Sequence, residues 1–373
     1  MVQQVPPTGL SNSRPFRNKV INGDMQIFQR STSATGLGAS AGYFHADRFD
    51  NYLSTTAGRF TAAQIADGPG VFGLNNCLKL SCTTADTSIA ANEVYHLQQH
   101  FEGQNMQDLR KGTSDAKKVT VSFYVKGNAS AKYTCNLYDN DTSGGRLISQ
   151  TFDVTTSWTR IVLTFPGDTT GALDNDANHS FSVWWTLHGG STYSGGTFTS
   201  NTWEAFDAGK SIGDSATSFF DSTDRTFFIT GVQLEVGDDA TDFEVLPRDV
   251  QLQRCMRYFQ KTGGNAGDQV IVPTNYCVVA TTAVLYVGFS TYVPMRGTIT
   301  LSATDCEALY GASATQTMST FGVFDNVVGS TGEFHGCSAQ ASASAGTPFT
   351  AGNTAGIRTA TDVDHFVSMD AEL

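Results

Sequence analysis

Charge, long apolar runs and paired cysteines are all scarce in this sequence. Only 16% of the residues are charged, and no stretch approaches the roughly 20 apolar residues of a membrane-spanning helix, so we expect no membrane insertion. The seven cysteines include no pair at C-x-x-C spacing, which argues against the paired ligands of a structural zinc site. We therefore expect free thiols, buried as small hydrophobic side chains in a protein that folds in a reducing cytoplasm.

Basic residues are also few. The chain has 23 Lys and Arg against 35 Asp and Glu, which gives a formal net charge of −12. Because a face that contacts phosphates needs clustered positive charge, a nucleic-acid partner is not expected. Residues 1–10 show no basic start followed by an apolar run, so the sequence predicts no secretory signal.

Strand patterning, by contrast, is frequent. The clearest case is residues 227–236, where one face carries the apolar or small side chains of Phe228, Thr230, Val232, Leu234 and Val236. Residues 21–28 alternate in the same way, and many similar runs follow, separated by Gly, Asn and Asp clusters. Helical periodicity is rare. We predict an all-β protein: a jelly-roll β-sandwich, a short connecting helix and a second, smaller β domain.

Several motifs occur together in this order along the chain. They are NKVINGDMQIFQR at 18–30, DRF at 47–49, FEGQ at 101–104, VSFYVK at 121–126, GVQLEVG at 231–237, the ATDFE exit at 240–244 and RCMRYF at 254–259. The set resembles a bacteriophage tail-fibre family, and YVPMRG at 292–297 and MDAEL at 369–373 resemble its C-terminal module. The resemblance implies a virion protein with a jelly-roll sandwich like those of carbohydrate-binding modules.

The function that this resemblance implies is that of a tail fibre that adheres to the host surface, with a glycan as the expected ligand. It further implies a homotrimer, made in the host cytoplasm and placed in the virion tail. One alternative is a head fibre, decoration or tail-adaptor protein without receptor binding. A glycan depolymerase is a third, less favoured alternative, because two carboxylates at a fixed separation are needed and the sequence does not pair them.

Four segments are predicted. Residues 1–19, rich in Gln, Pro, Ser and Asn, form either an anchor arm that docks onto other tail or baseplate proteins or a simple leader. The jelly-roll sandwich covers 20–247, the connecting helix 248–262 and the C-terminal β domain 263–373.

The helix prediction rests on an apolar stripe. Leu252, Cys255, Met256 and Phe259 recur at i, i+3, i+4 and i+7 within residues 248–261. Leu252, Met256 and Phe259 are candidate assembly residues at which three chains meet. The alternative is that the stripe packs on its own domain.

Aromatic side chains are the candidate ligand-binding residues. In residues 181–187, alternation places Trp185 with the core residues and Trp184 on the more polar face. The long connection 188–225 adds Tyr193, Phe198 and Trp203. Exposed rings of this kind can stack on a sugar. The alternative is that they hold the connection down or contact neighbouring subunits.

No convincing catalytic or metal site appears in the sequence. A G-x-S-x-G elbow is lacking and the histidines are dispersed, so we expect no enzyme activity and assign no catalytic residue. No metal-ligand set is assigned either, since His96 and His100 share a strand face but lack a third ligand at suitable spacing. A structural calcium ion near Asp174, Asp176 and Asn178 stays an open alternative, because oxygen ligands cluster there.

Overall fold

The chain folds into two compact units, residues 1–247 and 248–373. The computed structural model describes residues 16–263, 272, 274–304, 306–310, 314–329, 333–344, 346, 348–359 and 366–373. Most of the predicted anchor arm therefore lies outside the described residues. The described part is almost entirely β-structure, as the alternating sequence predicts. None of its helices is long and apolar enough to cross a membrane.

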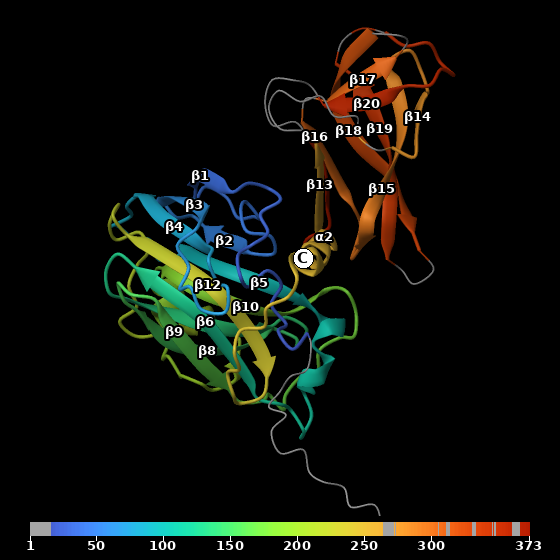
Figure 1. The fold of residues 1–373 in the computed structure, drawn as a ribbon. Coiled ribbons are helices and arrows are strands. Elements are labelled where there is room, and N and C mark those ends of the chain that lie inside the picture. Colours follow the sequence, from blue (N-terminus) through green and yellow to red (C-terminus); the bar gives the residue numbers. More distant parts are fainter. Residues whose placement is uncertain are drawn as a thin grey trace, which may run out of the picture. The chain divides into compact units, whose positions relative to one another are not determined.

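The first unit is a jelly-roll sandwich of two six-stranded antiparallel sheets (Figure 1). The chain passes between the sheets repeatedly, from β4 to β5, from β5 to β6 and again from β9 to β10. One sheet has the order β1 (Ser33–Leu37), β3 (Arg59–Ile65), β4 (Cys77–Thr84), β12 (Thr226–Val236), β6 (Val119–Gly127), β9 (Thr159–Phe165). The other has the order β11 (Glu204–Ala205), β8 (Arg146–Val154), β7 (Ala131–Asp139), β10 (His179–Gly189), β5 (Val94–Glu102), β2 (Asp50–Ser54).

The two sheets bury their facing side chains in one hydrophobic core. Ring contacts hold its centre together: the Trp185 ring centroid lies 5.6 Å from that of Phe123 and 6.2 Å from that of Phe49. Leu187 and Phe181, which share the Trp185 face of β10, are also in this core. The alternation of residues 181–187 thus has the predicted orientation. All seven cysteines are buried, and none of them is in a disulfide, as the sequence predicts.

The predicted strand at residues 21–28 is wrong. Residues 21–25 form bends and turns, and Asn22 and Met25 have positive φ values of 61° and 53°. The side chain of Asn22 explains the difference, because it makes the backbone hydrogen bonds that a neighbouring strand would otherwise make. Its amide donates to the carbonyls of Ile27 and Asp47, and its oxygen accepts from the backbone N–H groups of Gln26 and Ile27. Side-chain bonds of this kind compete with regular pairing.

Residues 17–23, which we call the docking segment, bind along β12 at its irregular point. The pairing of β12 with β6 shifts register between Thr230 and Gln233, and Gly231 there has a φ of 61°. Asn18 fills the gap: its amide donates to the Val232 carbonyl at 3.0 Å and its oxygen accepts from Leu234 N–H at 3.1 Å. A bulge in the strand thus becomes the attachment point for a distant segment.

Two buried carboxylates, Glu235 of β12 and Glu244 beyond its end, also hold the docking segment. Arg17 lies 3.0 Å from Glu235, and the backbone N–H of Asn18 donates to Glu244 at 3.0 Å. Gly23 completes the contact, because a Cβ atom there would lie 2.0 Å from the Val232 carbonyl oxygen. Much of the docking segment's residue pattern is therefore required by its fit to β12.

The long connection after β10 is folded down on the sandwich. It contains the short helices α1 (Ser191–Ser194) and η3 (Ala208–Lys210) as well as β11. Phe219 and Phe220 enter the core, where each has its ring centroid about 6 Å from that of Tyr95. Between β5 and β6 the chain forms two short 3₁₀ turns, η1 (Gly103–Asn105) and η2 (Gln107–Leu109).

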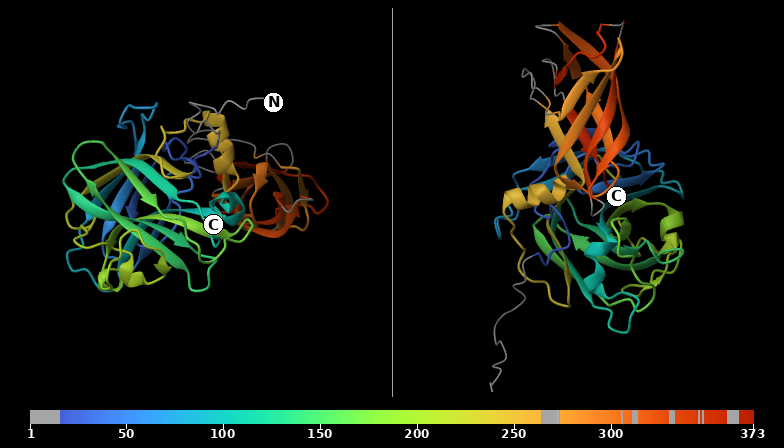
Figure 2. Two further views of the ribbon diagram at one scale, coloured as in Figure 1. Left: turned by 90° about the horizontal axis from the view of Figure 1, so that it is seen from below. Right: turned by 90° about the vertical axis from the view of Figure 1, so that its right-hand side faces the viewer.

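In the part that the structure describes, the second unit contains a short helix and two sheets (Figure 2). The smaller has the order β13 (Phe259–Gly263), β21 (Phe366–Asp370), β16 (Thr300–Thr304). The larger has the order β14 (Tyr276–Val279), β15 (Val284–Met295), β19 (Phe334–Ala343), β18 (Ala314–Val328), β17 (Cys306–Tyr310), β20 (Gly356–Thr359). Leu285 and Val287 of the larger sheet and Val367 and Met369 of the smaller one share a separate core.

The connecting helix is shorter than its apolar stripe predicts. Helix α2 covers Arg248–Met256, and the chain continues as strand β13 from Phe259. Phe259 therefore does not belong to a helical face: it is a buried strand residue paired with Asp370. Leu252 and Met256 remain on the helix and are half-buried. The i+7 residue was misassigned because pairing with β21, which no local pattern reveals, overrides the helical period.

Replacement of Asn18 by Ala should destabilise the first unit by at least about 2 kcal/mol. The buried groups of Val232 and Leu234 would lose their partners, and each such loss costs about 1–3 kcal/mol. Chemical denaturation measures the change. Asn92→Ala, at an exposed loop position of the same unit, is the matched control and should be nearly neutral. Equal stabilities of the two variants would contradict this role of Asn18.

Candidate functional site

The outer face of the sheet that contains β10 carries a line of rings. With Trp185 in the core, Trp184 turns to the outer face, opposite Gln98 of β5 and Asn136 of β7. The neighbouring strands contribute Tyr52 from β2, His96 from β5 and Tyr138 from β7, and Phe206 follows β11. These five residues, which we call the ring row, cross the sheet roughly perpendicular to its strands.

Neighbouring rings in the row are in contact. The centroid distances are 5.6 Å from Tyr52 to His96, 5.1 Å from His96 to Trp184, 4.6 Å from Trp184 to Tyr138 and 5.3 Å from Tyr138 to Phe206. Three of these pairs are stacked or tilted by no more than 30°, and the last is edge-on. Such contacts stabilise a ring cluster beyond simple burial.

The two ends of the row are open to solvent. Tyr52 is 43% exposed and Phe206 is 37% exposed, whereas Trp184 and His96 in the middle are only 9% and 4% exposed. The His96 imidazole bonds to the Thr186 hydroxyl at 2.8 Å, and burial lowers its pKa to about 3. The middle of the row is therefore a rigid, uncharged support, and the exposed rings at its two ends can contact a ligand.

Polar side chains of β2, β5 and β10 lie beside the rings. Gln98 donates to Asp50 at 2.7 Å, His100 lies 3.8 Å from Asp50, and His100 also bonds to the Ser182 hydroxyl at 3.0 Å. The His179 ring centroid is 4.1 Å from that of His100. His96 and His100, noted in the sequence as a possible metal pair, thus bond to separate hydroxyl groups.

The predicted ligand-binding residues are divided by the fold. Tyr193 of α1 joins the ring row, because its ring lies edge-on to His96 at 6.4 Å. Trp203 lies elsewhere: its indole N–H donates to the Pro166 carbonyl at 2.8 Å and its ring packs 6.3 Å from Phe181. Phe198 packs against Gly213. The four predicted residues therefore do not form one platform: Trp184 and Tyr193 lie in the same ring cluster, whereas Trp203 and Phe198 pack elsewhere.

Sequence reasoning missed Tyr52, His96, Tyr138 and Phe206. The strands that contain Tyr52, His96 and Tyr138 show the alternation that places these side chains outward, whereas Phe206 lies in the long connection just after β11. Their convergence depends on strand order and register, which the alternation does not determine.

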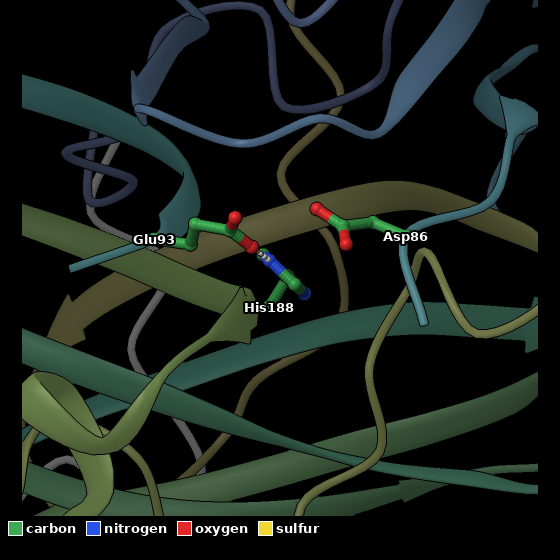
Figure 3. A group of neighbouring side chains, drawn as sticks. All are labelled: Asp86, Glu93 and His188. Carbon is green, nitrogen blue, oxygen red and sulfur yellow. Dashed lines mark hydrogen bonds and ion pairs between the residues drawn. The ribbon is translucent and has the colours of Figure 1, made fainter. Parts of the chain in front are cut away.

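A second group lies where the β4–β5 loop meets β10. Asp86 is in that loop, Glu93 immediately precedes β5, and His188 is near the end of β10. One ligand-type atom from each lies within 4.8 Å of the others, and all three residues are buried. Figure 3 shows the three side chains pointing toward one another. The β5–β10 pairing shifts register between Thr186 and His188, an irregularity of the kind that re-aims a side chain.

Burial dominates the ionisation of this acid–histidine group. Burial lowers the pKa of His188 to about 4. For Glu93, burial and the hydrogen bond with Asp86 raise the carboxyl pKa. Burial also acts to raise the pKa of Asp86, but hydrogen bonds from Glu93 and the backbone N–H of Ala57 outweigh it and hold the pKa below its ordinary value. The shared environment therefore moves the pKa values of the two carboxyl groups in opposite directions.

A pocket of about 270 Å³ lies against His188. Its wall includes Thr186 and residues 212–218 of the long connection. Ser218 bonds to His188 Nδ1 at 2.8 Å, and Glu93 lies 3.3 Å from His188 Nε2. This line of hydroxyl, imidazole and carboxyl resembles a catalytic triad in composition. The Ser218 hydroxyl, however, also accepts the backbone N–H of Phe220 at 3.0 Å within a local turn.

The polar groups of the segment predicted to hold calcium bond both within the segment and to neighbouring loops. Asp176 accepts the backbone N–H of Asn178 at 2.9 Å and the Asn178 side-chain amide at 2.5 Å. The carbonyl of Asp174 accepts from Gln107 at 3.1 Å. Among the residues that the structure describes, the group whose ligand atoms converge is Asp86, Glu93 and His188.

Comparison with known proteins gives structural likeness only. No protein-family model matches the chain, and no curated protein matches its sequence. The family 11 carbohydrate-binding module of Clostridium thermocellum, solved with a mixed-linked tetrasaccharide, is 13% identical, with 56% of this chain and 99% of that one covered at a TM-score of 0.29. The family 30 carbohydrate-binding module is 11% identical, with coverages of 60% and 96% and a TM-score of 0.29.

The enzymatically active domain of bacteriophage CBA120 tailspike protein 4 is a further neighbour. It is 10% identical, with 60% of this chain but only 22% of that one covered at a TM-score of 0.30. Scores this low carry no information on function.

Acidification should destabilise the first unit through its buried histidines. Burial lowers the pKa of His96 to about 3 from an ordinary 6.5, so between these values the unfolded chain binds a proton that the native state does not. The stabilising effect is complete above pH 6.5 and is lost as the pH falls toward 3. His96→Gln, which can keep the bond to Thr186, should reduce the slope of unfolding free energy against pH by about 1.4 kcal/mol per unit.

Denaturation curves at several pH values measure that slope. His335→Gln is the control, because this side chain is exposed and belongs to the second unit. A slope unchanged by His96→Gln would mean that His96 takes up its proton in the native state.

Proposed function

We propose that this protein is a bacteriophage virion protein, a tail fibre that attaches to a glycan on the host surface without cleaving it. The observation that carries the proposal is the ring row with its two exposed ends. A sugar ring has an apolar face and a rim of hydroxyl groups. A suitable surface therefore combines aromatic rings for stacking with side chains that donate and accept hydrogen bonds.

The neighbourhood of the row has this mixed chemistry. Asp50 and Gln98 lie two residues along their strands from Tyr52 and His96, and Asn136 is paired directly opposite Trp184. Rings on four adjacent strands span about 15 Å, since strands lie about 4.8 Å apart. That length favours an extended chain of several sugar units over a single monosaccharide.

A glycan that stacks only on the exposed ends of the ring row should bind weakly to a single copy of the protein. The tail-fibre resemblance supplies the compensating feature, because three copies per fibre and several fibres per virion would raise the overall avidity. In this proposal the chain forms a homotrimer, and its N-terminal arm connects it to other tail or baseplate proteins. Leu252 and Met256, half-buried on α2, remain the candidate assembly residues.

The virion assignment rests on the sequence motifs at 18–30 and 231–237. In the fold these two stretches contact each other through the docking segment and β12. The motifs therefore support a sandwich fold in common with the tail-fibre family that they resemble, and they carry no information about a receptor. That observation favours one alternative in particular: a head fibre, decoration or tail-adaptor protein with the same sandwich and no receptor. Labelling the protein on intact virions and imaging them would separate tail from head.

Removal of an exposed ring should weaken glycan binding without unfolding the protein. Tyr52→Ala and Phe206→Ala should each reduce affinity about 3- to 10-fold, equivalent to about 0.7–1.4 kcal/mol, because one stacking contact is lost. The assay is an array of host-surface glycans followed by calorimetric titration of the best ligand. Tyr276→Ala, a tyrosine of the second unit with 41% exposure, is the matched control.

Two outcomes would contradict this role. One is a wild-type protein that retains no glycan in multivalent form, which would favour the purely structural alternative. The other is a ligand that binds Tyr52→Ala and Phe206→Ala as tightly as it binds the Tyr276→Ala control, which would move the site away from the ring row.

The proposed role also requires no hydrolytic chemistry at Ser218. Its hydroxyl accepts the Phe220 N–H, and the paired imidazole is buried and neutral. We expect a fluorophosphonate probe to leave Ser218 unlabelled, and host polysaccharide incubated with the protein to release no new reducing ends. Labelling that disappears in Ser218→Ala, or reducing-end release above that of a heat-denatured sample, would instead identify an enzyme.

A further inference from the structure

The acid–histidine group at the end of β10 has the composition of a metal site. It combines one imidazole with two carboxyl groups, drawn from three separate chain segments. Imidazole nitrogen is a preferred ligand of Zn²⁺ and its neighbours in the transition series, whereas calcium sites use oxygen ligands. The donor set therefore selects a transition ion over calcium.

The spacing of the donor atoms also fits such an ion. Glu93 Oε2 lies 3.3 Å from His188 Nε2. Two ligands of one tetrahedral Zn²⁺, each about 2.0–2.1 Å from the ion, lie about 3.3–3.4 Å apart. With all three donor atoms within 4.8 Å of one another, a movement of at most about 1.5 Å by the Asp86 carboxyl would complete the set.

Each donor side chain is held by groups outside the set. The Ser218 hydroxyl bonds to the other imidazole nitrogen of His188 at 2.8 Å, and this leaves Nε2 directed at Glu93. Asp86 accepts the backbone N–H of Ala57 at 3.0 Å. Supporting bonds of this type orient ligands and fix the histidine tautomer in metal sites.

A pocket borders the group on one side. His188 and Ser218 both line this cavity of about 270 Å³, whereas Asp86 and Glu93 lie behind the imidazole and do not line it. A divalent ion would also balance the charge of two buried carboxylates, which is costly without a cation.

We propose that Asp86, Glu93 and His188 bind one Zn²⁺ ion or a similar transition-metal ion, with the remaining coordination filled by water. The ion would connect the β4–β5 loop to the end of β10 and so stabilise this edge of the sandwich. This inference is independent of glycan binding, because the three residues are separate from the ring row.

The test is a titration of the full chain, after chelator treatment, with Zn²⁺ by calorimetry and with Co²⁺ as an optical probe. We expect one tight Zn²⁺ equivalent per chain, a higher melting temperature in excess Zn²⁺, and visible Co²⁺ bands without the intense near-ultraviolet absorption of thiolate ligands. The affinity for Ca²⁺ should be lower by at least 100-fold.

Two variants assign the site. Glu93→Gln keeps the side-chain shape and should weaken Zn²⁺ binding at least 10-fold, and His188→Gln should do the same. His335→Gln, an exposed histidine of the second unit, should bind Zn²⁺ as the wild type does. The proposal is overturned if the wild type binds Zn²⁺ no more tightly than Ca²⁺, if folded Glu93→Gln retains wild-type affinity, or if the Co²⁺ complex shows thiolate ligation.

Discussion

The packing of the two sheets of the first unit against each other is the constraint on which its surface depends. Because Phe181, Trp185 and Leu187 of β10 are used to fill the core, Trp184 must face outward. The same alternation on β2, β5 and β7 sends Tyr52, His96 and Tyr138 to that face. Core formation and the ring row are therefore two consequences of one strand period, and a one-residue slip would exchange them.

Irregular points in the strands carry the remaining features. The register shift at Gly231 opens β12 to the docking segment, and the shift beside His188 accompanies its turn toward Glu93. Regular alternation can produce only faces of a sheet. A strand that attaches a distant segment or gathers ligands at its end needs a local departure from that pattern, which bulges provide.

Strand β10 links the two candidate sites. Trp184 is the middle of the ring row, Thr186 bonds to His96, and His188 belongs to the acid–histidine group. An ion at the end of this strand would fix the loop and the connection that border the pocket, while the ring row would stay accessible. In this arrangement the acid–histidine group would stabilise the sandwich and the ring row would contact the ligand, both on one rigid strand.

The sequence by itself determined the class of fold and the orientation of individual strands. Alternation placed Trp185 inside and Trp184 outside, because the period of a strand is a local property. Prediction from local pattern was wrong where contacts between distant residues override that pattern. Bonds of the Asn22 side chain turn the chain within the strand predicted at 21–28, and pairing with β21 ends the predicted helix before Phe259. Only tertiary structure decided that Tyr52, His96, Tyr138 and Phe206 meet Trp184, and that Asp86, Glu93 and His188 converge, since strand order and register bring together residues far apart in the chain.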